Sequence, residues 1–301
     1  MRIGLNVYLR KTKTFLKLLG YSIVFPFYKW QGTPHVLSVE DTLHRVINDK
    51  LSVARFGDGE YYHLIGKSTG LQQNDVILQN KLKETILCRN PKLLVCMVDF
   101  LNQKNCKIRK KLSFSYHYVR IYKKIKAYVD AGYKYGDTNL TRLYVGVKNK
   151  SNCSFHFGLC KQIWEGADIV IFEGDKTRFG IGNDLFDNVK SIRRILCPSK
   201  NAFKYYDQIL DKAKTFDKNC LLLFSLGITA TVAAKDLTDE GYRVIDIGNL
   251  DVEYEWLKLG VKKRVVLKGK QVGEIVEGTI VEEITDENYL EQIAGKIGIN
   301  E

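Results

Sequence analysis

The sequence predicts an α/β fold with a mostly parallel open sheet and helices on both faces. Ala167–Phe172 and Cys220–Ser225 are continuous apolar runs, which are typical of strands buried on both faces of a parallel sheet. Stretches with helical spacing of apolar residues alternate with such runs, as in strand–helix–strand units. Glycines and charged residues crowd directly after several runs, which is where open α/β sheets bind ligands. The chain has 301 residues, of which 45% are hydrophobic, so it can bury a full core.

Residues 1–35 form a basic segment ahead of the predicted domain. No acid occurs before Glu40, whereas the cations Arg2, Arg10, Lys11, Lys13, Lys17 and Lys29 all fall in this stretch. Leu and Phe residues at near-helical spacing lie between them and Trp30 follows, which is the pattern of an amphipathic helix at a membrane surface. A helix packed on the domain explains the same pattern, and both interpretations stay open. No stretch approaches the roughly 20 apolar residues of a membrane span.

The elements after residue 35 are predicted in order from their periodicity and end signals. They are a helix after Ser38, a strand over Leu51–Arg55, a helix over Asp75–Arg89, strands over Leu93–Val98, Ala167–Phe172 and Ser191–Cys197, a helix over Ala202–Lys214, a strand over Cys220–Ser225, a helix ending near Glu240, a strand over Tyr242–Ile247 and a terminal helix over Asp286–Ile297. Ser38 is a good N-cap because Asp41 follows three residues later. We therefore divide the chain into the segment 1–35, a domain over 36–265 and a C-terminal extension over 266–301.

Charge and cysteine content narrow the class of protein. The formal net charge of +13 is compatible with nucleic acid, an anionic membrane or phosphorylated ligands. Basic and aromatic residues mix between Phe100 and Tyr135, but a solvated helix face over tyrosines explains this section better than stacked bases. No nucleic-acid partner is therefore expected. The seven cysteines form no CxxC pair, which favours reduced thiols in the cytoplasm.

The stretch LSVARFGDGE at 51–60 predicts a strand that runs into a tight turn. Asp58 and Glu60 in that turn can both offer oxygen to one hard divalent cation. Gly57 and Gly59 permit positive φ and leave room for a bulky ligand. A solvated hairpin is the alternative interpretation of these residues.

Two further clusters follow predicted strands. Gly227 opens a small-residue helix whose backbone amides, with the Thr229 and Thr231 hydroxyls, suit a phosphate group. Asp251, Glu253 and Glu255 alternate in what we expect to be a loop at the end of the sheet. If that loop is extended the three acids share one face, and if it is helical Asp251 and Glu255 do.

Five blocks occur in a fixed order along the chain. They are RFGDGE at 55–60, GDTNLTR at 136–142, EGDKTRFGIGNDLF at 173–186, RILCPSKNAF at 194–203 and LGITATVAAKDLTDEGYRVIDIGNLDVEYEW at 226–256. Together they closely resemble the bacterial GT-D type glycosyltransferases, long catalogued as a domain of unknown function. The resemblance implies a Rossmann-like domain of the GT-D type, a nucleotide-sugar donor such as a UDP-hexose, and a divalent cation, Mn²⁺ or Mg²⁺, held through a DxE motif.

Carried over by position, the resemblance implies that Asp58 and Glu60 bind the metal and that Lys176 and Arg178 face the diphosphate. It places the Asp251/Glu253 region near the acceptor, and we take Glu253 and Asp251 as the candidate catalytic acids. Further donor contacts are expected from residues beside the predicted turns, which are Arg55, Gly57, Gly227, Thr229 and Thr231. Asn249 stands where the family pattern has His. Its oxygen can coordinate a hard cation, but an amide cannot titrate.

The sequence thus predicts a cytoplasmic, metal-dependent glycosyltransferase, docked on the inner face of the plasma membrane if the basic segment is a membrane anchor. The acceptor expected is a lipid-linked or protein-linked glycan. Of the acids, Glu253 is favoured as the general base, because in an extended loop its two acidic neighbours would raise its pKa toward a working value. The alternative is a non-catalytic nucleotide- or nucleic-acid-binding protein with a Rossmann-like core.

Overall fold

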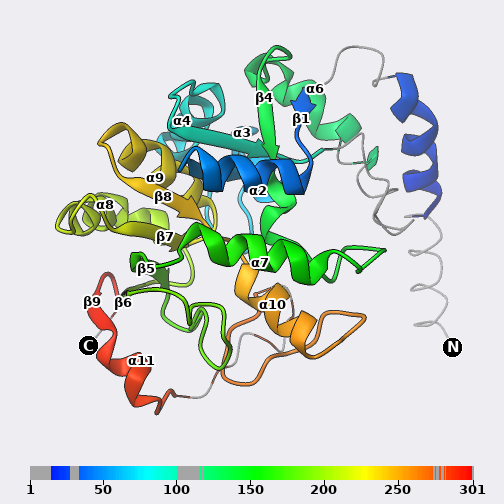
Figure 1. Cartoon of the computed structure of the whole chain (residues 1–301). Helices are drawn as coiled ribbons and strands as arrows, with labels where there is room; N and C mark the ends of the chain where they lie inside the picture. Colours follow the sequence, from blue (N-terminus) through cyan, green and yellow to red (C-terminus); the bar gives the residue numbers. More distant parts are fainter. Residues whose placement is uncertain are drawn as a thin grey trace, which may run out of the picture.

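The computed structural model describes residues 15–27, 34–99, 115–116, 118–273, 275, 278, 281 and 283–299. These residues form one sheet in the order β1-β4-β3-β2-β8-β7-β5-β6-β9 (Figure 1). The strands are β1 (His35–Val36), β2 (Ser52–Phe56), β3 (Leu93–Met97), β4 (Lys134–Asp137), β5 (Asp168–Gly174), β6 (Ser191–Cys197), β7 (Leu221–Ser225), β8 (Arg243–Asp246) and β9 (Ile293–Lys296). Every pairing described between them is parallel. The predicted Rossmann-like α/β fold is therefore confirmed.

Helices cover both faces of the sheet because the strands alternate their side chains between two cores. On β2, Ala54 and Phe56 join one core while Val53 joins the other. The first core contains α3 (Asp58–Leu64), α4 (Val76–Leu87), α8 (Tyr206–Lys214) and α9 (Ile228–Asp239); the second contains α2 (Val39–Asn48), α7 (Cys153–Ile163) and α10 (Leu250–Lys258). Buried strands between two helix layers explain why their sequences read as continuous apolar runs.

Side-chain caps set where two of these helices begin. The Ser38 hydroxyl accepts a hydrogen bond from the Asp41 amide at 3.0 Å, and α2 begins directly afterwards at Val39. Asp75 likewise accepts from the amides of Ile77 and Leu78 at the start of α4. Such caps satisfy amides that have no partner inside the helix. The predicted N-cap at Ser38 is confirmed.

The order of the strands reverses between β2 and β8. From β2 the chain moves outward through β3 and β4, whereas β8 is reached from the other half of the sheet through β7. The pairing described between β2 and β8 is a single position, Val53 with Ile245, whereas β2 and β3 pair over five. A crevice at the carboxyl ends of two such strands is the usual ligand site of an open α/β sheet.

Two expected turns or loops have regular structure. The turn expected at Gly57 is the start of α3, and Glu60 stabilises it because its Oε2 accepts from the Gly57 amide at 2.7 Å. The loop expected at 250–258 is the helix α10.

The C-terminal segment joins the sheet. The helix expected over 286–297 is wrong beyond its first part, because α11 (Glu287–Glu291) is followed by β9, which pairs with β6. Pairing lets the edge strand β6 satisfy its backbone groups, and this favours a strand over a longer helix. Gly295 suits this place, since a Cβ there would lie 3.2 Å from the Lys212 side chain.

The basic segment is described over residues 15–27, which are helical, and over its last two residues, 34–35. Tyr21 and Phe25 of this helix are partly buried against the first core, so the packed-helix interpretation holds for that face. No helix among the described residues is both long and apolar enough to cross a membrane. Residues 100–114 of the predicted basic and aromatic section lie outside the described residues, and Cys106 is among them. The other six cysteines are free thiols, as expected.

Candidate active site

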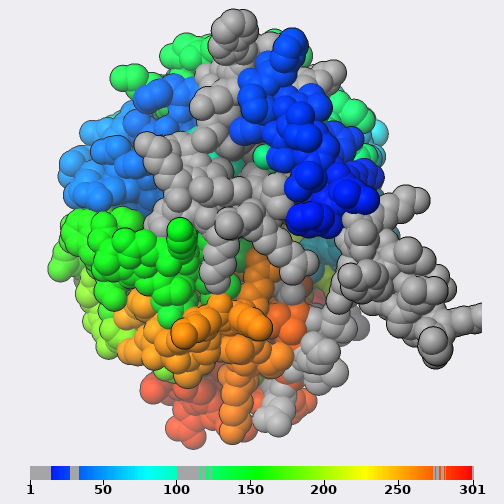
Figure 2. Space-filling model, turned by 90° about the vertical axis from the view of Figure 1, so that its right-hand side faces the viewer, coloured from blue at the N-terminus to red at the C-terminus, as the bar shows by residue number. Residues whose placement is uncertain are grey.

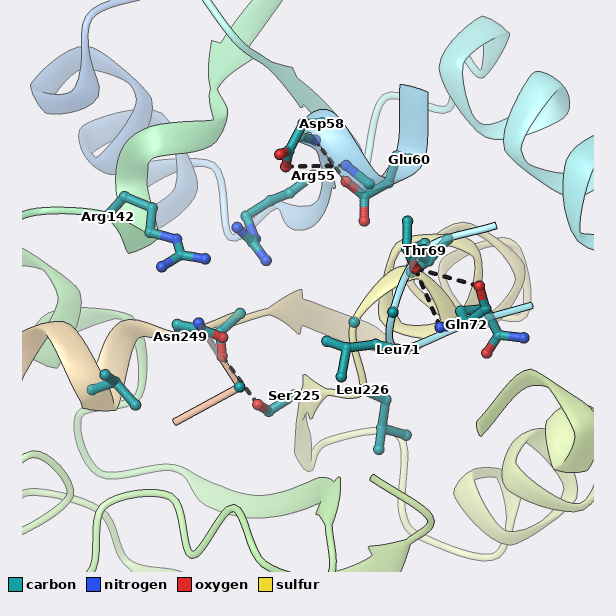
Figure 3. Close-up of a pocket in the computed structure, with 18 of the residues that line it drawn as sticks. Arg55, Asp58, Glu60, Thr69, Leu71, Gln72, Arg142, Ser225, Leu226 and Asn249 are labelled. Atoms are coloured by element: carbon teal, nitrogen blue, oxygen red, sulfur yellow. Dashed lines mark hydrogen bonds between the residues drawn. The ribbon is translucent and has the colours of Figure 1, made fainter. Parts of the chain in front are cut away.

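A cavity of about 960 Å³ lies at the carboxyl edge of the sheet. Its walls come from the residues that follow β2, β4, β5, β7 and β8, from the α3–α4 connection at 68–72 and from the segment 264–273. The Arg55 and Arg142 guanidinium groups point into it from one side, with Leu71 and Leu226 on another wall (Figure 3). Arg264 is a third arginine on the lining.

Arg55 and Asp246 join β2 to β8 at the floor of the cavity. Arg55 Nη2 and Nε donate to Asp246 Oδ1 at 2.8 and 3.1 Å, and Arg55 Nη1 donates to the Thr141 hydroxyl at 2.7 Å. Thr231 donates to the other Asp246 oxygen at 3.2 Å. Burial raises the pKa of Asp246, while the Arg55 guanidinium acts against that rise. The pair therefore fixes one cationic side chain on the cavity wall.

Gly248 is the position where this network leaves no room for a side chain. Its φ is +46°, and a Cβ there would overlap the Arg55 guanidinium. We expect Gly248→Ala to lower the free energy of unfolding by about 2–4 kcal/mol, because moving Arg55 leaves the buried Asp246 without its charged partner.

Gly182→Ala is the matched control for this prediction. Gly182 also has a positive φ, +76°, but has nothing within 4 Å of the added Cβ, so we expect a loss of only about 1 kcal/mol. Urea unfolding of both variants measures the difference. An equal loss of unfolding free energy in Gly248→Ala and Gly182→Ala would show that Arg55 moves aside freely.

Asp58 and Glu60 both line the cavity from the first turn of α3. Asp58 is exposed and its Oδ1 accepts from the Gly59 amide at 3.1 Å. The Glu60 carboxyl is deeper: burial, with the nearby Asp246 charge, raises its pKa to about 7. Below this pH the carboxyl holds a proton, which a bound cation would displace.

The residues fit a hard divalent cation that is held jointly by protein and ligand. Among the described residues, no group of three or more His, Cys, Asp or Glu side chains is arranged to hold a metal ion. Asn249, the N-cap of α10, lines the same cavity as Asp58 and Glu60 and adds an amide oxygen. Two carboxylates supplemented by ligand phosphates and water are a usual arrangement for Mg²⁺. All these donors are oxygens, which also suit Mn²⁺.

The N-terminus of α9 meets the N-terminus of α3 beside these acids. The position of a Cβ on Gly59 is 3.6 Å from Ile228 Cδ1, so the two helix starts are in contact. Gly227 caps α9 with φ +55° and ψ −134°, a conformation that glycine adopts readily, and it lines the cavity. A helix N-terminus with free amides attracts anions such as phosphate.

Two hydroxyls expected at that phosphate site lie elsewhere. Thr229 and Thr231 are fully buried and do not line the cavity. Thr231 instead donates to the Arg55 carbonyl at 3.0 Å and to Asp246. On a helix they follow one another at i and i+2, so both cannot face the ligand that Gly227 faces.

Lys176 and Arg178 do not line the cavity either. Lys176 is exposed, whereas Arg178 is buried and its Nη1 donates to the Gly269 carbonyl at 2.8 Å. Arg178 also has a positive φ of 50°. The cations that the structure brings to the cavity are arginines from other blocks, Arg55 and Arg142, together with Arg264 from the C-terminal segment.

Asp251 lines the cavity from α10 with both of its oxygens engaged. Lys270 donates to Asp251 Oδ2 at 2.7 Å, and Asn183 donates to Oδ1 at 2.7 Å. Both donors also bond Glu255 Oε1, at 3.0 and 2.6 Å. Burial raises the pKa of Asp251, while Lys270 acts against that rise. Asp251 and Glu255 share one helix face, as the helical alternative predicts.

Glu253 also lines the cavity but faces a different partner. Its Oε2 accepts from the backbone amides of Tyr144 and Val145, both at 2.8 Å, and its Oε1 lies 3.9 Å from Arg142 Nη1. The reason given for Glu253 as the base, an extended loop with Asp251 and Glu255 beside it, is therefore wrong. The role of Glu253 as the general base stays a prediction.

Sequence reasoning missed Asp246, Lys270 and Arg264 at this site. Asp246 is the last residue but one of the predicted strand 242–247, and a charge near the end of a buried strand is a signal that could have found it. Arg264 lies at the very end of the predicted domain and Lys270 lies in the predicted C-terminal extension, where no periodic pattern links either residue to the sheet.

Comparison with known proteins places this site in a family. Residues 53–275 match the family described as "Glycosyltransferase GT-D fold". The "Probable glycosyl transferase Gly" of Streptococcus gordonii is 34% identical over 264 residues, 87% of this chain and 39% of that protein. "Glycosyltransferase GlyD" of Streptococcus pneumoniae is 34% identical over 267 residues, 87% of this chain and 32% of that protein. The chain thus spans well under half of the length of these relatives.

Solved structures agree with the match. The structure described as "The highly conserved domain of unknown function 1792 has a distinct glycosyltransferase fold" superposes with a TM-score of 0.84 at 36% identity, covering 88% of this chain and 96% of that chain. A glycosyltransferase of the same domain type from Streptococcus sanguinis gives a TM-score of 0.84 at 34% identity, covering 88% of this chain and all of that chain. The matched residues run from Val53 in β2 through β8 and contain the cavity-lining residues described above. The chain therefore belongs to the glycosyltransferases with the GT-D fold.

Proposed function

We propose that the chain transfers a hexose from a nucleotide sugar, UDP-glucose or UDP-galactose, to a glycan acceptor, in the synthesis of a surface polysaccharide or glycoprotein. The observation that carries this proposal is the convergence of Asp58 and Glu60 with the N-terminus of α9 in one cavity. Carboxylates for a divalent cation and helix amides for a phosphate are what a nucleoside-diphosphate donor requires.

Side chains on the cavity wall can supply the groups that sugar transfer requires. In transfer, the bond from the sugar anomeric carbon to the diphosphate breaks and a bond to the acceptor oxygen forms. The acceptor hydroxyl loses its proton to a carboxylate, for which Glu253 and Asp251 are the candidates. Asp58, Glu60 and Asn249 would hold the cation, which when bound offsets negative charge on the leaving diphosphate. Arg55, fixed by Asp246, adds a preorganised positive charge to the same cavity.

The direct test is release of UDP from a panel of UDP-sugars by the purified chain. We expect release with one or two UDP-hexoses in the presence of Mn²⁺ or Mg²⁺, and none after the metal is removed with EDTA. Restoring the cation should restore the rate. Binding of UDP without any release from the panel, with or without an acceptor extract, would instead support a non-catalytic nucleotide-binding protein.

A further inference from the structure

The helix over residues 15–27 has an inner face that fixes it on the domain. Tyr21 and Phe25 are partly buried against the first core. The Tyr21 ring meets the Tyr116 ring edge-on, with the centroids 5.0 Å apart, and the Lys17 ammonium lies 5.6 Å from the centroid of the same ring. These contacts leave the opposite face of the helix turned away from the domain.

That outer face is a continuous apolar stripe. Its side chains are Phe15, Leu16, Leu19, Ile23, Val24 and Phe27, which are between 41% and 77% exposed. Phe15, Leu19, Ile23 and Phe27 recur every four residues and so form one line along the helix. The stripe holds six of the fourteen exposed large hydrophobic residues found in the described part of the chain. Such a concentration on one helix marks a contact surface rather than ordinary solvated surface.

The charge of the sequence that contains the helix indicates the partner. Six Lys and Arg residues occur within the first 29 residues, and the first acid is Glu40. A basic sequence that contains a helix with one apolar face is attracted to an anionic lipid surface, into which the apolar side chains insert. We propose that this stripe docks the protein on the surface of an anionic lipid bilayer.

The docking helix is connected to the rim of the cavity. Tyr116, which Tyr21 contacts, accepts a hydrogen bond from Arg120, and the next residue, Ile121, lines the cavity. In Figure 1 the helix stands on the right, the side toward which the β8 arrow points, and Figure 2 shows it exposed on that side. Docking would therefore hold the cavity close to the bilayer. Together with the proposed function, on which this step rests, it makes a lipid-linked glycan the expected acceptor.

Vesicle binding of the full chain tests the docking proposal. The variant is Ile23→Ser with Phe27→Ser, since these side chains are 73% and 77% exposed and their loss should leave the fold intact. The matched control is Val76→Ser with Ile77→Ser, whose side chains are 67% and 64% exposed on α4. We expect wild type and control to cosediment with phosphatidylcholine vesicles that contain phosphatidylglycerol, and the stripe variant to bind at least about tenfold more weakly.

Further arms of the same experiment decide between partners. Binding should fall with added salt and on pure phosphatidylcholine, because the basic residues act through the anionic surface. Equal binding by the stripe variant and wild type, or no vesicle binding by wild type, would overturn the proposal. A third outcome would also overturn the proposal: wild type self-associates by light scattering and binds no vesicles, and the stripe variant no longer self-associates. A second copy of the chain would then cover the stripe. Vesicle binding needs no nucleotide sugar, so its failure is distinct from failure of UDP release.

Discussion

Replacing Asp58 with Ala, or Glu60 with Gln, should lower the rate of sugar transfer by at least about a hundredfold while the protein stays folded. Both carboxylates line the cavity beside the N-terminus of α9, where the proposed cation offsets the charge on the leaving diphosphate. Loss of such an interaction raises the barrier by several kcal/mol, and each 1.36 kcal/mol is about tenfold in rate. Transfer kinetics under saturating donor measure the effect.

The choice of Gln at position 60 follows from the second role of Glu60. Its Oε2 caps α3 through the Gly57 amide, so Ala would also remove a cap that contributes about 1 kcal/mol to stability. A Gln side chain can make the same capping bond without the charge.

Glu40→Gln is the matched control for the metal pair, because it removes an exposed acid from the first turn of α2, away from the cavity. Titration of Mn²⁺ into the protein with UDP gives a readout that is independent of turnover. We expect weaker Mn²⁺ binding for both site variants and wild-type Mn²⁺ binding for the control. If Asp58→Ala and Glu60→Gln keep wild-type Mn²⁺ affinity and near-normal transfer, the metal pair is assigned wrongly.

The sheet could be predicted from the sequence because its strands are apolar on both faces. The runs at 167–172 and 220–225 are typical of strands buried between two helix layers, and β5 and β7 lie there. The terminal strand β9 could not be predicted in this way. Its four residues, IAGK, form a strand only because β6 offers an unpaired edge, and this information lies a hundred residues away in the chain.

Positions in the candidate site were predicted better than orientations. Asp58, Glu60, Gly227, Asp251, Glu253 and Arg55 were all expected at the sheet edge, and all line the cavity. Lys176 and Arg178 follow a buried strand equally closely, yet Lys176 is exposed and Arg178, whose φ is positive, donates to the Gly269 carbonyl instead. A sequence pattern indicates which residues follow a strand, whereas the local backbone and side-chain angles decide where each side chain points.

The acids of α10 carry the last prediction, since one of them is expected to take the proton of the acceptor. Asp251 has both oxygens bonded to Lys270 and Asn183. Glu253 uses Oε2 for two backbone amides, but within the described part of the chain its Oε1 makes no hydrogen bond, and Arg142 is 3.9 Å away. Glu253 therefore has an oxygen available on the cavity wall, and this favours it as the base even though α10 is not extended.

Glu253→Gln should slow transfer by about 10²–10⁴-fold with little change in UDP affinity or in the free energy of unfolding. An amide oxygen can still accept from Tyr144 and Val145, so the loop stays in place, but the amide cannot take a proton. Asp251→Asn should instead lower stability, because the buried Lys270 loses a charged partner and the amide nitrogen must face one of two donors, Lys270 or Asn183. Glu255→Gln is the control, since Glu255 accepts a hydrogen bond from the same Lys270 but does not line the cavity.

Transfer rates, UDP titrations and urea unfolding on all three variants separate these roles. A Glu253→Gln protein that transfers sugar as fast as Glu255→Gln eliminates Glu253 as the base, because the two then differ in nothing that the reaction uses.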